Sequence, residues 1–370
     1  MSGLREPVIL VASDEFTLKS SPVRRTLEQR LIDDLRFALH RDGFTGFRIQ
    51  KDAARLVVTG LPQADAGAKS CSRIFGVAYA APGVLISANM EAVLESVVNL
   101  AKQELERGGS FAIRAHVSVA SPLSRREIEL KGGSSVLQAL LDRGISVNLG
   151  NPDLTIHVDL VGERAYVYGE RLQGPGGLPL SSQWKMLAVL DCGPLTLLAT
   201  FAMMRRGCLA ELFIPISNTI VGFAAKGQLE LARNLRQFVT RPNYKAFTID
   251  YDKLIANRTG SDNYQPTVAR DFVRVAAARF AKGSKFKGLV IADAFGDIGS
   301  VQRLRSASPD LPIFTPLIGL DLDDLVELGE RVGVSRSQLS ESLEPEGGAL
   351  PILMDLPDSL ANLQVEELAL

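Results

Sequence analysis

Short apolar runs and longer helical stretches alternate along the first 170 residues of the chain. Five apolar stretches predict strands, at 8–12, 55–60, 73–81, 111–120 and 154–170. The last stretch, LTIHVDLVGERAYVYGE, alternates apolar and polar positions on both sides of Gly162 and Glu163. This pattern is typical of two strands joined by a tight turn.

The stretch 20–43 (SSPVRRTLEQRLIDDLRFALHRDG) has the features of an amphipathic helix. An apolar residue recurs every four positions from Val23 to Leu39, so one face is apolar. Ser21 is expected to cap its start and Gly43 to end it. Together with the two flanking strands, this helix predicts a small β–α–β unit.

Two more helices are predicted in this half, at 88–106 and 124–143. The second begins at Ser124 with Glu127 three residues later, the spacing of a capping box. A segment rich in Gly and Pro follows at 172–179 (LQGPGGLP), and it predicts a domain boundary.

Beyond that boundary, apolar strands and helices alternate regularly. The predicted elements lie at 187–190, 194–206, 209–214, 224–239, 245–250, 268–282, 287–292, 299–307, 313–314 and 322–332. Such alternation predicts an α/β domain with a parallel, doubly wound sheet. The residues after 336 are rich in Ser, Glu, Gly and Pro, and a partly disordered tail is expected there.

The overall composition is that of an ordinary globular protein. The 370 residues allow two or three domains. No apolar run is long enough for a membrane span and no signal peptide is evident, so a cytoplasmic protein is expected. Three cysteines and three histidines predict neither a disulfide framework nor a metal site.

The net charge of −1 conceals a basic body and an acidic tail. Seven acidic residues and no Lys or Arg follow Arg336, which leaves 41 basic and 35 acidic residues in the rest of the chain. A mildly basic body is compatible with RNA binding, although the charge alone does not identify RNA as a ligand.

The stretch LAVLDCGPLTLLATFAMMRRGC (187–208) combines a strand, a tight turn and a helix. Many α/β enzymes build a phosphate cradle in this way, because backbone N–H groups at a helix N-terminus face the anion. The turn here contains one glycine, Gly193, where a cradle usually has several. Its neighbours decide between a nucleotide site and a structural turn.

Up to about residue 335 the chain resembles the tRNA 4-thiouridine synthetases. The resemblance is carried by LKSSPVRRTLEQRL (18–31), RIFGVAYAAPG (73–83), NPDLTIHVDLVGERAYVYGERLQGPGGLPL (151–180) and TPLIGLDLDDLVELGERVGV (315–334). It implies a ferredoxin-like domain at 1–75, a THUMP RNA-binding domain at 76–175, a PP-loop-like domain at 176–336 and an acidic, flexible tail at 337–370.

The stretch at 187–208 stands where this family has its PP-loop, Ser-Gly-Gly-x-Asp-Ser, and MMRRGC fixes the register. In that register Asp191 replaces the first Ser, Cys192 replaces the first Gly, and Gly193 is kept. Leu195 replaces the Asp, and Thr196 keeps a hydroxyl in place of the last Ser. These four positions, Asp191, Cys192, Gly193 and Thr196, are the candidate nucleotide-binding residues of a degenerate site.

The substitutions weaken a phosphate cradle. Asp191 adds a negative charge beside the anion, and Cys192 adds a side chain where close backbone approach is needed. Pro194 removes one N–H donor. These changes argue against ATP as a cofactor and favour a structural turn, although a retained ATP site stays open as an alternative.

The family's catalytic cysteine is also missing, because no cysteine follows Cys208. Persulfide chemistry requires a thiolate, so no catalytic residue is assigned. Cys192 at a helix N-terminus is either a reactive thiol or, the commoner case, a small buried side chain. Cys208 is expected in the core.

The resemblance further implies that the first two domains grip the acceptor arm of tRNA. Phosphate contacts of this kind use Lys and Arg and fix position without reading sequence. The candidate RNA-binding residues are Lys19, Arg24, Arg25, Arg114, Arg125, Arg126, Lys131 and Arg171. Any one of them alone is better explained as a solvated surface charge, but the set favours RNA contact.

The hypothesis from sequence is a tRNA-binding member of this family with a degenerate catalytic domain. It would act as a pseudoenzyme or as the partner of a separate tRNA-modifying enzyme, and as a homodimer if it follows some relatives. The first alternative is an active ATP-dependent sulfurtransferase that makes 4-thiouridine with an external sulfur carrier. The second is a regulatory protein that binds another ligand in the former nucleotide cleft.

Overall fold

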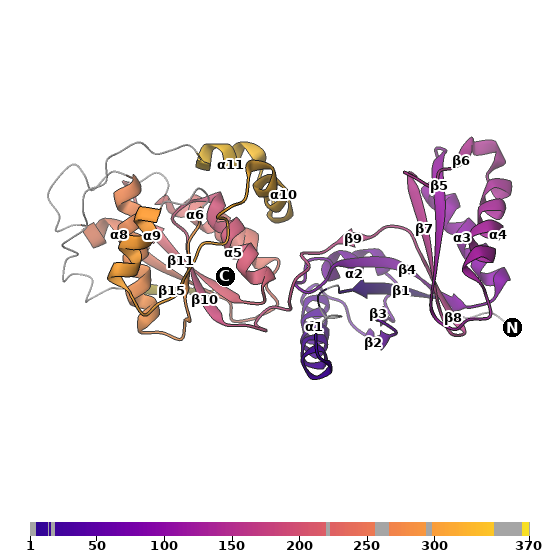
Figure 1. The fold of residues 1–370 in the computed structure, drawn as a ribbon, viewed down its shortest axis with the longest axis horizontal. Coiled ribbons are helices and arrows are strands. Elements are labelled where there is room, and N and C mark those ends of the chain that lie inside the picture. The colour runs from indigo at the N-terminus through magenta and orange to yellow at the C-terminus, as the bar shows by residue number, and fades with distance from the viewer. Residues whose placement is uncertain are drawn as a thin grey trace. The chain divides into compact units, whose positions relative to one another are not determined.

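The computed structural model describes residues 5–13, 15, 19–219, 223–255, 266–293, 298–343 and 365–369. The chain forms two compact units, Met1–Gly177 and Leu178–Leu370, each with its own sheet (Figure 1).

The first unit contains one mixed sheet. Its elements are β1 (Arg5–Ala12), α1 (Ser21–Arg41), β2 (Arg48–Asp52), β3 (Arg55–Thr59), α2 (Ala64–Cys71), β4 (Tyr79–Ser87), α3 (Met90–Glu104), β5 (Gly109–Val119), α4 (Arg125–Ala139), a 3₁₀ turn (Leu141–Arg143), β6 (Ile145–Val147), β7 (Leu154–Val161), β8 (Arg164–Tyr168) and β9 (Leu172–Gln173). The strand order is β2-β3-β1-β4-β8-β7-β5-β6, and β9 pairs with β4.

Strand β4 joins the two halves of this sheet. It pairs antiparallel with β1 on one side and with β8 on the other. Gly83 is required here, because a Cβ at this position would lie 2.7 Å from the Val167 carbonyl oxygen. The two halves of the first unit therefore share one continuous sheet.

Helix α1 buries the apolar face predicted for it, although its first apolar residue, Val23, is 48% exposed. The expected cap was wrong. Ser21 is the first helical residue, and the N-cap is Ser20, whose side chain makes no capping hydrogen bond. In α4 the predicted capping box is present, with Ser124 Oγ accepting from the Glu127 N–H.

The second unit is a doubly wound α/β domain. Its elements are β10 (Lys185–Val189), α5 (Pro194–Arg205), β11 (Leu209–Ile216), α6 (Ala225–Arg236), β12 (Lys245–Asp250), α7 (Tyr251–Ile255), α8 (Pro266–Lys282), β13 (Leu289–Val290), α9 (Ile298–Ala307), β14 (Ile313–Phe314), α10 (Leu322–Val332), α11 (Arg336–Leu343) and β15 (Val365–Ala369). The strand order is β14-β13-β10-β11-β12-β15.

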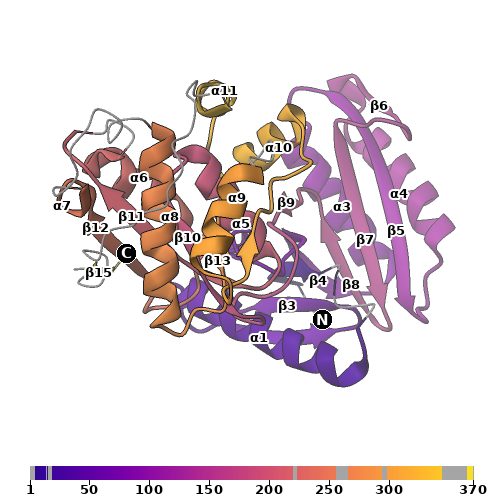
Figure 2. The same ribbon diagram turned by 60° about the vertical axis from the view of Figure 1, so that its left-hand side comes forward.

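The strands from β10 to β14 are parallel, and β15 is added antiparallel at the β12 edge. Helices α8 and α9 pack together on one face of the sheet, and α5 and α6 pack together on the other (Figures 1 and 2). The predicted α/β class is confirmed, with a mixed rather than purely parallel sheet. Among its described residues, the expected flexible tail contains the regular elements α11 and β15.

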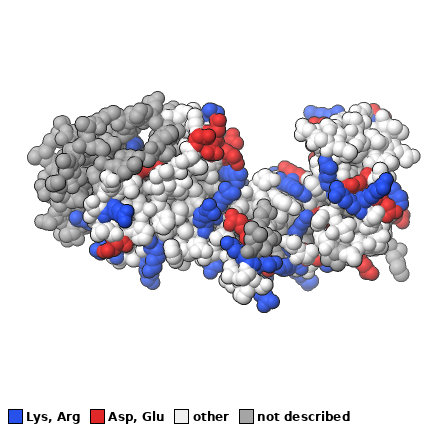
Figure 3. Space-filling view, in the orientation of Figure 1, with Lys and Arg blue, Asp and Glu red and all other residues white. Residues whose placement is uncertain are grey.

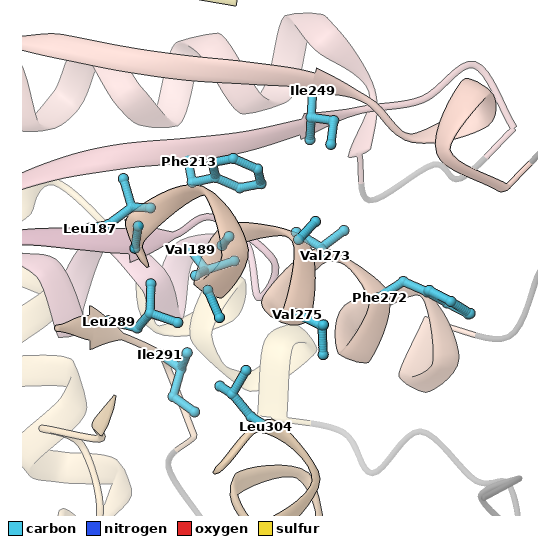
Figure 4. Packing of buried hydrophobic residues seen from close by; sticks show 14 of the residues in the cluster. Leu187, Val189, Phe213, Ile249, Phe272, Val273, Val275, Leu289, Ile291 and Leu304 are labelled. Atoms are coloured by element: carbon cyan, nitrogen blue, oxygen red, sulfur yellow. The ribbon is translucent and has the colours of Figure 1, made fainter. Parts of the chain in front are cut away.

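The main core of this unit lies between the sheet and α8. Leu187, Val189 and Phe213 of the strands belong to one buried cluster with Phe272, Val273 and Val275 of the helix (Figure 4). Helix α5 is almost wholly buried, because α6, α10 and α11 pack against it. This packing fixes the start of α5 against the carboxyl end of β10.

Candidate functional site

The turn between β10 and α5 places Asp191, Cys192, Gly193 and Thr196 together at the carboxyl edge of the parallel sheet. Gly193 has φ of +50°, a conformation that favours glycine, and Pro194 occupies the first turn of α5. A Cβ at Gly193 would have no atom within 4 Å. Glycine is therefore favoured here by the backbone angle and not by a lack of space.

Asp191 is buried and paired with an arginine of α8. Its Oδ2 lies 2.5 Å from Nε of Arg274, a residue that is only 2% exposed. The same guanidinium donates to Asp293, with Nη2 2.8 Å from Oδ1 and Nη1 3.3 Å from Oδ2. Asp191, Arg274 and Asp293 form what we call the ion cluster, which links the ends of β10 and β13 to α8.

Cys192 borders the ion cluster, with Sγ 3.6 Å from Nη2 of Arg274. Desolvation and the neighbouring Asp191 carboxylate raise the pKa of the Cys192 thiol to about 12. A thiol with this pKa is protonated at neutral pH and is a poor nucleophile. The raised pKa favours an unreactive thiol at Cys192, whose side chain is partly buried, and Cys208 is buried as expected.

The one hydroxyl of the turn bonds to the protein's own backbone. Thr196 Oγ1 donates to the Val189 carbonyl at 3.2 Å and accepts from the Cys192 N–H at 3.3 Å. The side chain of Thr196 is fully buried. The hydroxyl of the turn thus bonds to the protein's own backbone, and its carboxylate is paired with Arg274.

Arg274 and Asp293 were not predicted from the sequence as residues of this site. Arg274 lies within an otherwise apolar run of α8 (FVRVAAA), and Asp293 follows directly after the β13 run. Two sequence features could have predicted them. One is a lone charge on an apolar helix face, and the other is an acid at the end of each of two parallel strands. Gln228 of α6 was missed too; its Nε2 donates to the Leu190 carbonyl at 3.2 Å.

No group of three metal-ligating side chains occurs in the part of the chain that the structure describes. The segment ADAFGDIGSVQR (292–303), which leads from β13 into α9, is described only in part, since residues 294–297 lie outside the described ranges.

The eight candidate RNA-binding residues lie in the first unit and have different surroundings. Lys19, Arg25 and Arg126 are exposed. Arg125 pairs with Glu129 at 2.9 Å and Lys131 with Glu127 at 3.6 Å, both one turn along α4. Exposed ion pairs of this kind contribute little free energy, so both cations remain accessible to a ligand.

The other three candidates are more constrained. Arg114 donates to the Leu149 carbonyl. Arg171 is 3.1 Å from both the Tyr168 hydroxyl and Nδ1 of His157, and its guanidinium lies 4.7 Å from the Tyr79 ring centroid. Arg24 lines a cavity. Figure 3 shows Lys and Arg side chains interspersed with acidic ones on one face of the molecule.

Three family models match the chain in succession. They are a ThiI ferredoxin-like domain over residues 8–81, a THUMP domain over 87–170, and the family described as thiamine biosynthesis protein (ThiI) over 181–350. In the part of the chain that is described, no helix is long and apolar enough to cross a membrane.

The chain is similar to proteins named tRNA sulfurtransferase over most of its length. The probable tRNA sulfurtransferase of Thermococcus kodakarensis is 26% identical over 348 residues, covering 88% of this chain and 87% of the relative. That of Macrococcus caseolyticus is 29% identical over 336 residues, covering 88% and 82%.

Two solved structures share the fold. A 4-thiouridine synthetase in complex with RNA and bound ATP has a TM-score of 0.71 at 20% identity, covering 98% of this chain and 99% of the other. A Pyrococcus horikoshii protein has a TM-score of 0.65 at 19% identity, covering 89% and 100%. The chain therefore belongs to the ThiI family, in which a ferredoxin-like domain, a THUMP domain and a PP-loop domain follow one another.

Proposed function

We propose that this protein binds tRNA through its first unit and serves tRNA modification without an active nucleotide site of its own. It acts as a pseudoenzyme, presenting tRNA to a separate modifying enzyme in the cytoplasm. The observation that carries this proposal is the contrast between the exposed cations of the first unit and a strand–helix turn whose acid, Asp191, is paired with Arg274.

The RNA-binding side is supported by the comparisons and by exposed cations. Relatives covering most of the chain are named tRNA sulfurtransferase, and a protein of the same fold is described with bound RNA. Lys19, Arg25 and Arg126 are exposed on the first unit and are able to reach phosphates.

The loss of nucleotide chemistry is supported by the ion cluster. An ATP phosphate at the start of α5 would meet the Asp191 carboxylate, whose charge Arg274 already compensates. The Thr196 hydroxyl is bonded to its own turn. The sequence has no cysteine after Cys208 to carry sulfur.

The alternative is an active, ATP-dependent sulfurtransferase that makes 4-thiouridine in tRNA. It is favoured by the names of the relatives and by the bound ATP of the protein with the same fold. It requires a sulfur carrier supplied by another protein. A homodimer is compatible with either function.

A gel-shift titration of the full-length chain with tRNA tests the proposal. We expect salt-sensitive binding, and a double Arg25→Ala, Arg126→Ala variant that binds roughly tenfold more weakly with a smaller salt slope. Lys285→Ala, an exposed residue of the second unit, is the matched control and should bind like wild type. The proposal fails if the wild-type chain does not shift tRNA at low salt.

A further inference from the structure

The first unit contains a cavity of about 600 Å³ that the proposed function does not use. It is bounded by the end of β1, helix α1, the β2–β3 turn and the end of β5. Its polar lining includes Ser13, Arg24, Glu28, Lys51, Arg55 and His116. A volume of this size is within the range of small-molecule sites.

Two polar atoms of the lining are buried without a partner. Nε of Arg24 and Oγ of Ser13 make no hydrogen bond within the described ranges of the chain. Both groups can donate, and a buried donor left unsatisfied costs roughly 1–3 kcal/mol. Such groups in a native structure commonly indicate a missing partner.

The charges of the lining leave Arg24 uncompensated. Lys51 Nζ lies 2.6 Å from Glu28 Oε1, and Arg55 is paired with the buried Asp159 behind it. Arg24 has no ion pair with the residues that the structure describes around this cavity. The cavity therefore carries a residual positive charge, beside the exposed imidazole of His116.

We propose that this cavity binds the phosphate group of a mononucleotide-sized ligand. Arg24 Nε and Ser13 Oγ would donate to the phosphate oxygens, and the residual charge would balance the anion. Guanidinium groups bind phosphate with well-defined geometry. They are weakly hydrated, so removing their water costs little free energy. The site is assigned from the cavity alone and does not rest on the proposed role in tRNA modification.

The full-length chain tests this with inorganic phosphate and uridine 5′-monophosphate as probes. We expect both to raise the melting temperature relative to chloride at matched ionic strength, and ³¹P line broadening to report binding. Arg24→Ala and Ser13→Ala should weaken binding about tenfold to a hundredfold, since each removes a hydrogen bond to a charged group.

Arg36→Ala is the matched control, because Arg36 is an exposed arginine of the same helix and does not line the cavity. It should bind phosphate like wild type. Arg24→Lys keeps the charge without the Nε donor, so it tests the geometry if the alanine variant does not fold. Equal responses of wild type to phosphate and chloride, or equal losses in the Arg24 and Arg36 variants, would overturn the proposal.

A single-stranded RNA tetranucleotide distinguishes two sources of the phosphate. If it displaces bound uridine 5′-monophosphate, the group belongs to a nucleic acid; if the mononucleotide stays bound, the group belongs to a small ester. Either result supports the phosphate site. Because neither probe is tRNA, failure of this site is separable from failure of the proposed function.

Discussion

Asp191 and Arg274 are both buried, so each depends on the other to compensate its charge. Asp293 binds the same guanidinium from the end of the neighbouring strand. An unpaired charge at such a depth is costly, so removing either partner should destabilise the protein. A cation from α8 thus compensates the acids that follow β10 and β13.

We predict that Arg274→Met lowers the free energy of unfolding by about 3–5 kcal/mol, because two carboxylates lose their buried counter-ion. Urea denaturation measures this. Arg279→Met, at an exposed position of the same helix, is the control and should change stability by less than about 0.5 kcal/mol. Equal effects of the two substitutions would contradict a structural role for the ion cluster.

His157 provides a second prediction, on pH. Its ring stacks on Tyr168, and burial together with the Arg171 guanidinium lowers the pKa of His157 from 6.5 to about 4. Between these two values the unfolded chain binds a proton that the folded chain does not. Stability should therefore fall as pH decreases from about 6.5 to about 4.

Urea midpoints measured at several pH values between 7 and 4 test this. His157→Gln should show a weaker loss of stability with acid than wild type, because the group responsible is gone. His40→Gln, at an exposed position of α1, is the control and should keep the wild-type dependence. An unchanged pH dependence in His157→Gln would show that other groups cause it.

At the residue scale, local sequence patterns predicted only which residues of one turn lie together. Asp191, Cys192, Gly193 and Thr196 are close in sequence, so a strand–turn–helix pattern places them together. Arg274 and the compensation it provides could not be derived, because they depend on which helix packs over which strand end. Sequence therefore identified the acid in the turn but not its partner.

At the scale of elements, the helices with clear periodicity and caps were predicted well, and the irregular strands were not. The strand expected at 73–81 is β4, Tyr79–Ser87. Pro82 and Gly83 suggest a break in the sequence, yet in the sheet Gly83 lets β4 approach β8 closely. This need for a glycine arises from a strand far along the chain and has no local signal.

The capping box of α4 gives a prediction at this scale. Ser124→Ala should lower the free energy of unfolding by about 1 kcal/mol, because the Glu127 N–H loses its acceptor. Thermal or urea denaturation provides the value. Ser134 is exposed on the same helix, and its hydroxyl donates to the Leu130 carbonyl one turn earlier. Ser134→Ala should therefore have a smaller effect. A larger loss in Ser134→Ala would argue against the cap.

At the scale of the whole molecule, the two units carry different parts of the account. The first unit joins the ferredoxin-like and THUMP halves through one sheet, and it holds the candidate RNA-binding cations. The second has the doubly wound fold, and the Asp191 and Thr196 side chains after its first strand bond within the protein. The alternation of strands and helices predicted this architecture, because doubly wound folds follow from element order. The antiparallel β15 had no such signal.

Calorimetric titration of ATP into the full-length chain saturated with tRNA tests the central claim most directly. Millimolar ATP should give no saturable heat, because the Asp191 carboxylate is paired with Arg274 and the Thr196 hydroxyl is bonded within its own turn. Saturable ATP binding to the tRNA complex would contradict the account and would favour the active sulfurtransferase.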